Sequence, residues 1–253
     1  MNSAQHVAAV AAETARFVAT VKTADLSTPA PTCPGWTLAD LTQHTGQVQR
    51  WFTELLRRRI QHPPTSRDVE LHLPEHADGY PDWLAESATE ATEVFAATDL
   101  NAPMWAWGLD QHARFWVRRM LCETLVHRAD AELALGLSPH IDRALAVDGI
   151  DEFLTNLPFA SPFAPLTAEL RGPDRTIRFS CTDSGDDWVI GLRPDGFGLM
   201  PADTESRTAD ATVQATATDL LLLIYGRLDR RNDTLRLLGD QDLLTHWFTH
   251  SAF

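Results

Sequence analysis

The sequence predicts a protein of two parts, an N-terminal four-helix bundle followed by a small C-terminal α+β domain. In the first part, apolar residues recur at spacings of three and four, which is the period of an amphipathic helix. After Pro165 the pattern shifts toward alternation, which is typical of strands, and helical stretches follow near the C-terminus. We place the boundary in the proline-bearing segment PFASPFAP, so the expected domains are residues 1–160 and 161–253.

Composition narrows the class of protein. Of the 253 residues 44% are hydrophobic, which is enough for a substantial core, and the formal net charge is -14. This acidity argues against a nucleic-acid partner, which needs clustered Lys and Arg, and against an anionic membrane surface. The sequence has no apolar run of about eighteen residues and no basic, apolar signal peptide at its start. Because its three cysteines are widely spaced, we expect a soluble cytoplasmic protein.

Five helices are predicted before the boundary, and the first four form the bundle. They span residues 3–24, 38–60, 82–97, 110–136 and 141–157. Thr37 is the expected N-cap of the second helix, because Asp40 follows three residues later in a capping-box arrangement. Gly136 stands where the C-terminal cap of the fourth helix is expected. Variable connections between helices of 15 to 27 residues favour a bundle.

The C-terminal part is expected to combine short strands with short helices. The predicted strands are residues 166–172, 176–183, 187–194, 195–200 and 209–217, with SGDD as a hairpin-like turn between the second and third. Thr218 is the expected cap of a short helix that starts at Asp219, and residues 241–250 form the last helix.

Polar residues stand on two apolar helix faces. One stripe of the fourth helix consists of Trp116, Met120, Glu123, His127, Ala131 and Ala134. A buried carboxylate and imidazole need an explanation, because unpaired buried charge is costly. The second helix has a similar stripe, formed by Leu41, His44, Val48, Trp51 and Leu55. His44 is therefore expected to face the core, as Glu123 and His127 are.

The residues His44, Glu123 and His127 predict a metal site. Zinc accepts two imidazoles and one carboxylate, and three protein ligands with one open position describe a catalytic site. Nickel or ferrous iron fit the same ligands. In the alternative interpretation each histidine is a satisfied core residue and Glu123 pairs with one of the arginines Arg118, Arg119 and Arg128. Three polar residues at core-facing positions on two helices favour the metal.

Two further residues bear on this site. His6, on the first helix, is the one remaining candidate for a fourth ligand. A fourth protein ligand would make the site structural rather than catalytic. Cys33, in the segment TCPGW before the second helix, is interpreted as a structural residue.

Two motifs resemble a known family. TCPGWTLADLTQHTGQVQRW and CETLVHRADAE are similar to motifs of the mycothiol-dependent maleylpyruvate isomerase family, which belongs to the DinB-like metal-binding bundles. The C-terminal part, with IYGR and LLGD, resembles the family's small sterol-carrier-like α/β domain. The resemblance implies that His44, Glu123 and His127 are metal ligands. It also implies a catalytic arginine from the C-terminal domain, for which Arg227 is the best match among several arginines nearby.

The resemblance also implies an activity. A zinc-bound thiolate of mycothiol, the thiol cosubstrate, would attack an electrophilic small molecule, giving cis–trans isomerisation of a maleylpyruvate-like acid or S-transfer. Ala129 stands where the family often has an aromatic residue, and many members transfer mycothiol to other electrophiles. The alternative is a non-catalytic zinc-binding protein whose C-terminal domain binds a small apolar ligand or a protein partner. The acceptor, the metal's identity and the oligomeric state stay open.

Overall fold

The structure is a computed structural model that describes residues 1–65, 69–201 and 208–252. The chain forms two compact units, Met1–His140 and Ile141–Phe253. The division expected from the sequence, at 160/161, differs from this in assigning the helix that starts at Arg143 to the bundle. Among the described residues, every helix is too short or too polar to span a membrane.

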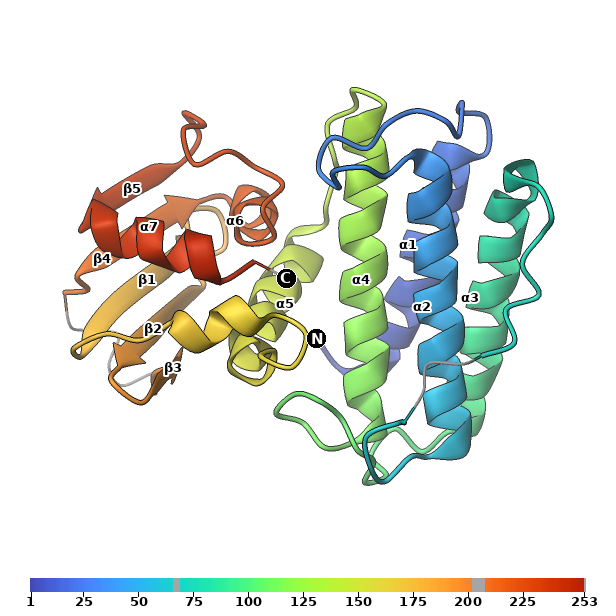
Figure 1. Ribbon diagram of the computed structural model, residues 1–253, viewed down its shortest axis with the longest axis horizontal. Helices are drawn as coiled ribbons and strands as arrows, with labels where there is room; N and C mark the ends of the chain where they lie inside the picture. The colour runs from blue at the N-terminus through green and yellow to red at the C-terminus, as the bar shows by residue number, and fades with distance from the viewer. Residues whose placement is uncertain (66–68, 202–207, 253) are drawn as a thin grey trace. The chain divides into compact units, whose positions relative to one another are not determined.

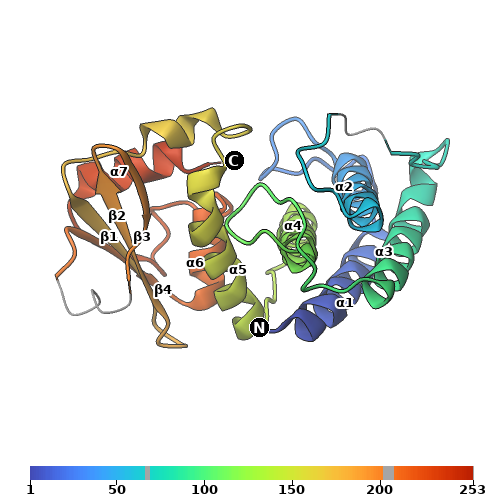
Figure 2. The same ribbon diagram turned by 90° about the horizontal axis from the view of Figure 1, so that it is seen from below.

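The first unit is a bundle of four long helices (Figures 1 and 2). They are α1 (Ser3–Val21), α2 (Leu38–Arg58), α3 (Tyr80–Ala97) and α4 (Ala113–Ala134). Helix α1 packs against α3 and α4, and α2 packs against the same two helices. The four-helix bundle predicted for the N-terminal part is therefore confirmed, with each helix close to its expected range.

Local capping signals determine where α2 begins and where α4 ends. The Thr37 hydroxyl accepts a hydrogen bond from the Asp40 backbone N–H, and the Asp40 carboxylate accepts one from the Thr37 backbone N–H at 2.8 Å. This is the predicted capping box. Gly136 follows the end of α4 with a φ of +71°, a conformation that glycine adopts without strain, and its N–H donates to Leu133 O.

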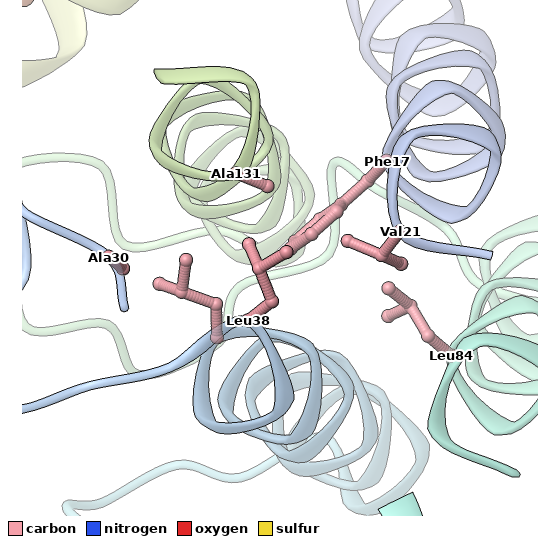
Figure 3. Packing of buried hydrophobic residues seen from close by; sticks show 7 residues of the cluster. Phe17, Val21, Ala30, Leu38, Leu84 and Ala131 are labelled. Atoms are coloured by element: carbon pink, nitrogen blue, oxygen red, sulfur yellow. The ribbon is translucent and has the colours of Figure 1, made fainter. Parts of the chain in front are cut away.

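Apolar side chains from all four helices and from the loop between α1 and α2 form one part of the bundle core (Figure 3). These residues are Phe17, Val21, Ala30, Leu38, Leu41, Leu84 and Ala131. Each is at most 2% exposed, so the loop that carries Ala30 is anchored in the core.

Helices α2 and α3 approach closely at Gly46. A Cβ atom at position 46 would lie 2.1 Å from Cζ3 of Trp83, whose ring is 2% exposed and whose Nε1 donates to Leu71 O at 2.8 Å. The ring is rigid and held in place, so it cannot move aside cheaply. The contact therefore requires glycine in the middle of a helix.

We expect Gly46→Ala to destabilise the bundle by about 1–3 kcal/mol, the usual range for overpacking. Helix propensity alone predicts the opposite sign, because alanine is favoured over glycine by about 1 kcal/mol in a helix interior. Urea unfolding measures the change, and the same substitution in a Trp83→Phe background should cost less. An unchanged or raised stability would contradict the close approach.

The second unit is an α+β fold around one sheet (Figure 1). Its sheet has the strand order β3-β2-β1-β4-β5, in which β1 and β4 are parallel and the other neighbours antiparallel. The strands are β1 (Arg175–Cys181), β2 (Asp187–Arg193), β3 (Gly196–Leu199), β4 (Ala211–Ala215) and β5 (Arg236–Gly239). The helices are α5 (Arg143–Asn156), α6 (Ala217–Ile224) and α7 (Gln241–His250). The α/β character predicted for the C-terminal part is confirmed.

Two local predictions in this unit are wrong. Residues 166–172 do not form a strand, because Pro165 starts the 3-10 helix η3 (Pro165–Glu169) and Thr167 bonds back to Ala164 O. The cap of α6 is Thr216 rather than Thr218, since the Thr216 hydroxyl accepts from the Asp219 N–H. Strand β5 has no counterpart among the predicted strands.

Candidate metal centre

The three predicted ligand residues meet in the bundle. Glu123 and His127 lie one turn apart on α4, and His44 comes from α2, which packs against α4. One ligand atom from each residue lies within 4.8 Å of the other two. The Nε2 atom of His127 is 3.6 Å from Oε2 of Glu123, and the two imidazole rings are 4.9 Å apart, edge to face.

His44 is less buried than its stripe predicts. Together with Val48 and Trp51 it is half-buried, while Thr45, Gly46 and Gln49 on the neighbouring face of α2 are fully buried. Its expected place facing the core is therefore corrected to the edge of the core. The side chain of Glu123 is 24% exposed, and that of His127 is 10% exposed. The group is thus accessible from outside the bundle.

Arg119 holds one oxygen of Glu123. This arginine, one turn earlier on α4, is only 3% exposed in its side chain and donates from Nη2 to Oε1 of Glu123 at 2.9 Å. Burial raises the pKa of the Glu123 carboxyl, but attraction to Arg119 and to the two histidines outweighs burial, so the pKa lies below its ordinary value. Glu123 is therefore an anion whose other oxygen, Oε2, faces His127.

Asp130 holds one nitrogen of His127. Its carboxylate is fully buried and lies 2.9 Å from Nδ1 of His127, one turn away on α4. The same carboxylate accepts hydrogen bonds from the hydroxyl of Thr32 and the thiol of Cys33, in the loop before α2. With Nδ1 engaged, the nitrogen of His127 that faces Glu123 is Nε2.

An aromatic side chain borders the two histidines. The Trp36 ring centroid is 4.9 Å from that of His44 and 6.1 Å from that of His127, with which it stacks at 29°. Trp36 is half-buried and follows Gly35, whose φ of +86° turns the chain there. It adds an indole wall to the group of ligand atoms.

The structure contains both contacts that the non-metal interpretation expects, an arginine partner for Glu123 and a core partner for His127. Glu123 does pair with an arginine, Arg119, and His127 does bond to a core partner, Asp130. These pairings use Oε1 of Glu123 and Nδ1 of His127, while Oε2 of Glu123 and Nε2 of His127 lie 3.6 Å from one another. Two imidazoles and an ionised carboxylate that converge in this way fit a divalent ion such as zinc.

A second group of potential ligands shares His127 and consists of Cys33, His127 and Asp130. These three are already joined by hydrogen bonds, because the thiol of Cys33 and Nδ1 of His127 both lie against Asp130 Oδ2. His6 is buried on α1, and among the residues that the structure describes it belongs to neither group. The first group thus has three potential protein ligands among the described residues.

Arg227 lies in the second unit, just after α6. It is half-buried, and its Nη1 donates to the backbone oxygen of Tyr225 at 2.6 Å. The ligand residues all lie in the first unit, so the bundle alone brings together the predicted metal group but not this arginine.

Sequence patterns missed two residues of this centre, Asp130 and Trp36, and left a third, Arg119, among three candidate partners of Glu123. Arg119 had a usable signal, since it stands four residues before Glu123, the spacing of an intrahelical ion pair. Asp130 had a weaker signal, three residues after His127. Trp36 had none, because nothing in its spacing connects the loop before α2 to α4.

The first unit is a four-helix bundle that brings two imidazoles and a carboxylate together, and an α+β unit follows it. This arrangement is typical of bundle proteins that build metal sites from side chains on facing helices. Residues 7–132 match the family described as the mycothiol maleylpyruvate isomerase N-terminal domain. Residues 144–246 match the family described as the MDMPI C-terminal domain. The chain belongs to the mycothiol maleylpyruvate isomerase family, as its motifs predict.

Solved structures show the same fold. The crystal structure of the mycothiol-dependent maleylpyruvate isomerase and that of a point mutant of it each align with a TM-score of 0.62 at 12% identity. In both cases the alignment covers 94% of this chain and 93% of the other. At this identity the likeness concerns the fold. No curated protein sequence matches the chain.

Proposed function

We propose that this protein is a metal- and mycothiol-dependent enzyme that isomerises a maleylpyruvate-like acid or transfers the thiol to an electrophile. The observation that carries the proposal is the convergence of His44, Glu123 and His127 in a bundle of this family. Zinc is the proposed ion, because two imidazoles and one carboxylate, with no fourth protein ligand among the residues that the structure describes, are typical of catalytic zinc. His44, Glu123 and His127 would hold the ion, which would supply a Lewis acid that favours the thiolate form of a bound thiol near neutral pH.

The residues of the chain prepare this site for a small-molecule reaction. Arg119 keeps Glu123 ionised, and Asp130 orients His127, so the ligand atoms are held in place before anything binds. Trp36 offers an apolar surface beside the histidines, on which an unsaturated acceptor can pack. Such a surface also excludes water from one side of the reacting atoms.

The reaction balances without any further reactant. The cosubstrate, as its thiolate after loss of the S–H proton, adds through sulfur to one carbon of the activated double bond, and the electron pair of that bond moves to the conjugated carbonyl as an enolate. The carbon–carbon bond that remains is single and free to rotate. Where elimination does not follow, the enolate takes up the proton that the thiol lost. Elimination of the thiol restores the double bond in the trans configuration and returns the thiol unchanged. Addition without elimination, or displacement of a leaving group, gives S-transfer instead, so both outcomes use one site.

We assign the acceptor's carboxylate to Arg227. A guanidinium binds a carboxylate with two parallel hydrogen bonds, which suits a keto acid such as maleylpyruvate. This assignment rests on the matching of the YGR segment to the family. Arg230 stands in the same loop, is exposed, and contacts Phe248 and Thr245 instead, so it offers a matched control.

The proposed function is tested by metal analysis and turnover. We expect purified protein to contain a stoichiometric divalent metal and to isomerise maleylpyruvate, or to consume a model electrophile, only when mycothiol is present. Removal of the metal with a chelator should abolish turnover, and zinc should restore it. If the purified protein contains the metal but shows no thiol-dependent turnover of any acceptor, the proposed enzymatic function is wrong.

The role of Arg227 is tested separately. Arg227→Gln should raise KM for the acceptor roughly 10- to 100-fold, the equivalent of one charge-assisted hydrogen bond pair, and leave the metal content unchanged. Arg230→Gln should leave KM within about twofold of the wild type, because a surface substitution has little effect. Equal effects of the two variants would assign the carboxylate to another residue.

A second candidate function is a zinc-binding protein without catalysis, whose C-terminal domain binds a small apolar ligand. The observation that favours it is an open cavity of about 820 Å³ in the second unit, within the range of ligand sites. Its apolar lining includes Leu223, Ile224, Leu237 and Phe248. Binding of an apolar fluorescent probe by a protein that has metal but no turnover would favour this function.

A further inference from the structure

The carboxylate of Asp130 is a buried junction between α4 and the loop before α2. It is 0% exposed, and its polar neighbours include the Thr32 hydroxyl at 2.6 Å from Oδ1, the Cys33 thiol at 3.3 Å from Oδ2, and Nδ1 of His127 at 2.9 Å from Oδ2. Thr32 and Asp130 are 98 positions apart in the chain. A buried carboxylate is stable only when its oxygens are satisfied, and here protein donors satisfy them.

The loop that supplies two of these donors is itself tightly closed. Backbone hydrogen bonds join Ala30 N to Trp36 O, Cys33 N to Ala30 O, and Trp36 N to Cys33 O. At its ends Leu38 N bonds to Thr28 O, and Pro29 pairs with Thr37 as an isolated bridge. Residues 28–38 therefore form a compact hairpin that presents the side chains of Thr32 and Cys33 in a fixed direction.

The hydrogen-bond chemistry determines which nitrogen of His127 carries the proton. A carboxylate only accepts, so the imidazole must donate to Asp130 from Nδ1. A neutral imidazole has one N–H, and its second nitrogen is then an acceptor with a lone pair. In His127 that nitrogen is Nε2, which lies 3.6 Å from Glu123 Oε2 within the proposed ligand group.

We propose that Asp130 is the positioning residue of the metal centre: it fixes His127 as the Nδ1–H tautomer with Nε2 ready to bind the ion, and Thr32 and Cys33 orient Asp130 for this task. This inference rests on the proposed function for its metal, but the tautomer belongs to the protein alone. It also gives Cys33 a role as a donor to Asp130 and couples the hairpin that carries Trp36 to the helix that carries two ligands.

The variant Asp130→Asn tests the proposal sharply. Thr32 donates to Oδ1, which keeps the oxygen of an asparagine amide on that side and places its NH₂ group against His127 Nδ1. Nδ1 must then accept, which moves the proton to Nε2 and blocks the metal-binding lone pair. We expect zinc affinity to fall roughly 10- to 100-fold, as for other partners of metal-bound histidines, in a protein of nearly unchanged shape.

A matched control is Asp110→Asn. Asp110 makes the same kind of contact, 2.6 Å from Nδ1 of His112 just before α4, but His112 belongs to neither ligand group among the described residues. Its zinc affinity should equal that of the wild type. Thr32→Val and Cys33→Ala each remove one donor and leave the carboxylate, so their affinities should lie between those of the wild type and Asp130→Asn.

The measurements are zinc affinity by competition with a chromophoric chelator and the tautomer of His127 by nitrogen-15 NMR of the metal-free protein. The Nδ1–H form in the wild type and the Nε2–H form in Asp130→Asn support the proposal. The proposal is overturned if His127 of the wild type carries its proton on Nε2, or if Asp130→Asn binds zinc with wild-type affinity. Complete loss of metal in Cys33→Ala would also overturn it, because Cys33 would then be a ligand. If the wild type binds no metal, the proposed function is wrong, but the tautomer of His127 still tests the role of Asp130. If Asp130→Asn does not fold, the zinc affinities of Thr32→Val and Cys33→Ala test it instead.

Discussion

Replacement of His127 by alanine is expected to remove bound metal and thiol-dependent turnover together. Loss of an outer partner of a ligand costs about 10- to 100-fold in metal affinity, and loss of the ligand itself should cost more than that range. Replacement of His44 by alanine should have the same effect, because the two imidazoles come from different helices and neither can substitute for the other. Metal content after gel filtration and turnover with mycothiol measure both losses.

The histidine variants are cleaner tests than a variant of Glu123. Replacement of Glu123 by glutamine leaves Arg119, which is 3% exposed in its side chain, without its carboxylate partner, so stability falls along with metal binding. His112→Ala is the matched control, because it removes a histidine at the start of α4 outside both ligand groups of the described residues. Full metal content in both His44→Ala and His127→Ala would show that the ligand assignment is wrong.

Elements with local determinants were predictable from sequence. The capping box at Thr37 and the glycine after α4 depend on residues within one turn, so the ends of two helices could be placed. Strand prediction failed at 166–172, where alternation over a few residues competes with Pro165. Strand β5 was missed because it is short and mostly exposed, with Leu238 at 45%, and therefore shows little alternation of burial.

The residues of the candidate site also differ in how far the sequence predicted them. His44, Glu123 and His127 could be proposed because the sequence alone shows polar residues on apolar helix stripes. In the structure, one ligand atom of each residue lies within 4.8 Å of the other two. The sequence leaves the partner of Glu123 open among three arginines, although only Arg119 stands at the four-residue spacing of an intrahelical ion pair. Packing decides it: Arg119 points along α4 to Glu123, while Arg128 reaches Glu13 on α1. The contact of Thr32 with Asp130 requires knowledge of the tertiary fold.

Arg128 forms the most buried ion-pair network described in the bundle. Its guanidinium is 0% exposed, donates from Nε to Glu13 on α1, pairs through Nη1 with Glu132 and donates from Nη2 to His140 O at 3.1 Å. The side chain of Glu13 is 3% exposed and also accepts from Arg16. The network ties α1 to α4 and to the chain after α4.

We expect Arg128→Ala to destabilise the bundle by about 3–5 kcal/mol, because removal of one partner leaves buried carboxylates uncompensated. Urea unfolding followed by tryptophan fluorescence measures this, since most tryptophans lie in the first unit: Trp36, Trp51, Trp83, Trp105, Trp107 and Trp116. Arg128→Met combined with Glu13→Gln should be less destabilised than Arg128→Met alone, because the double variant removes one of the two carboxylates, Glu13 and Glu132, that lose Arg128 as a partner. A change within about 0.5 kcal/mol for Arg128→Ala would contradict this role.

The adjacent residues His127 and Arg128 are expected to separate two properties. Their side chains leave α4 about 100° apart, so one reaches the ligand group and the other reaches α1. Protein of Arg128→Ala that remains folded should bind zinc with near wild-type affinity, whereas His127→Ala should stay folded and lose the metal. Loss of metal in folded Arg128→Ala, measured below its unfolding midpoint, would mean that the α1–α4 contact itself shapes the ligand group.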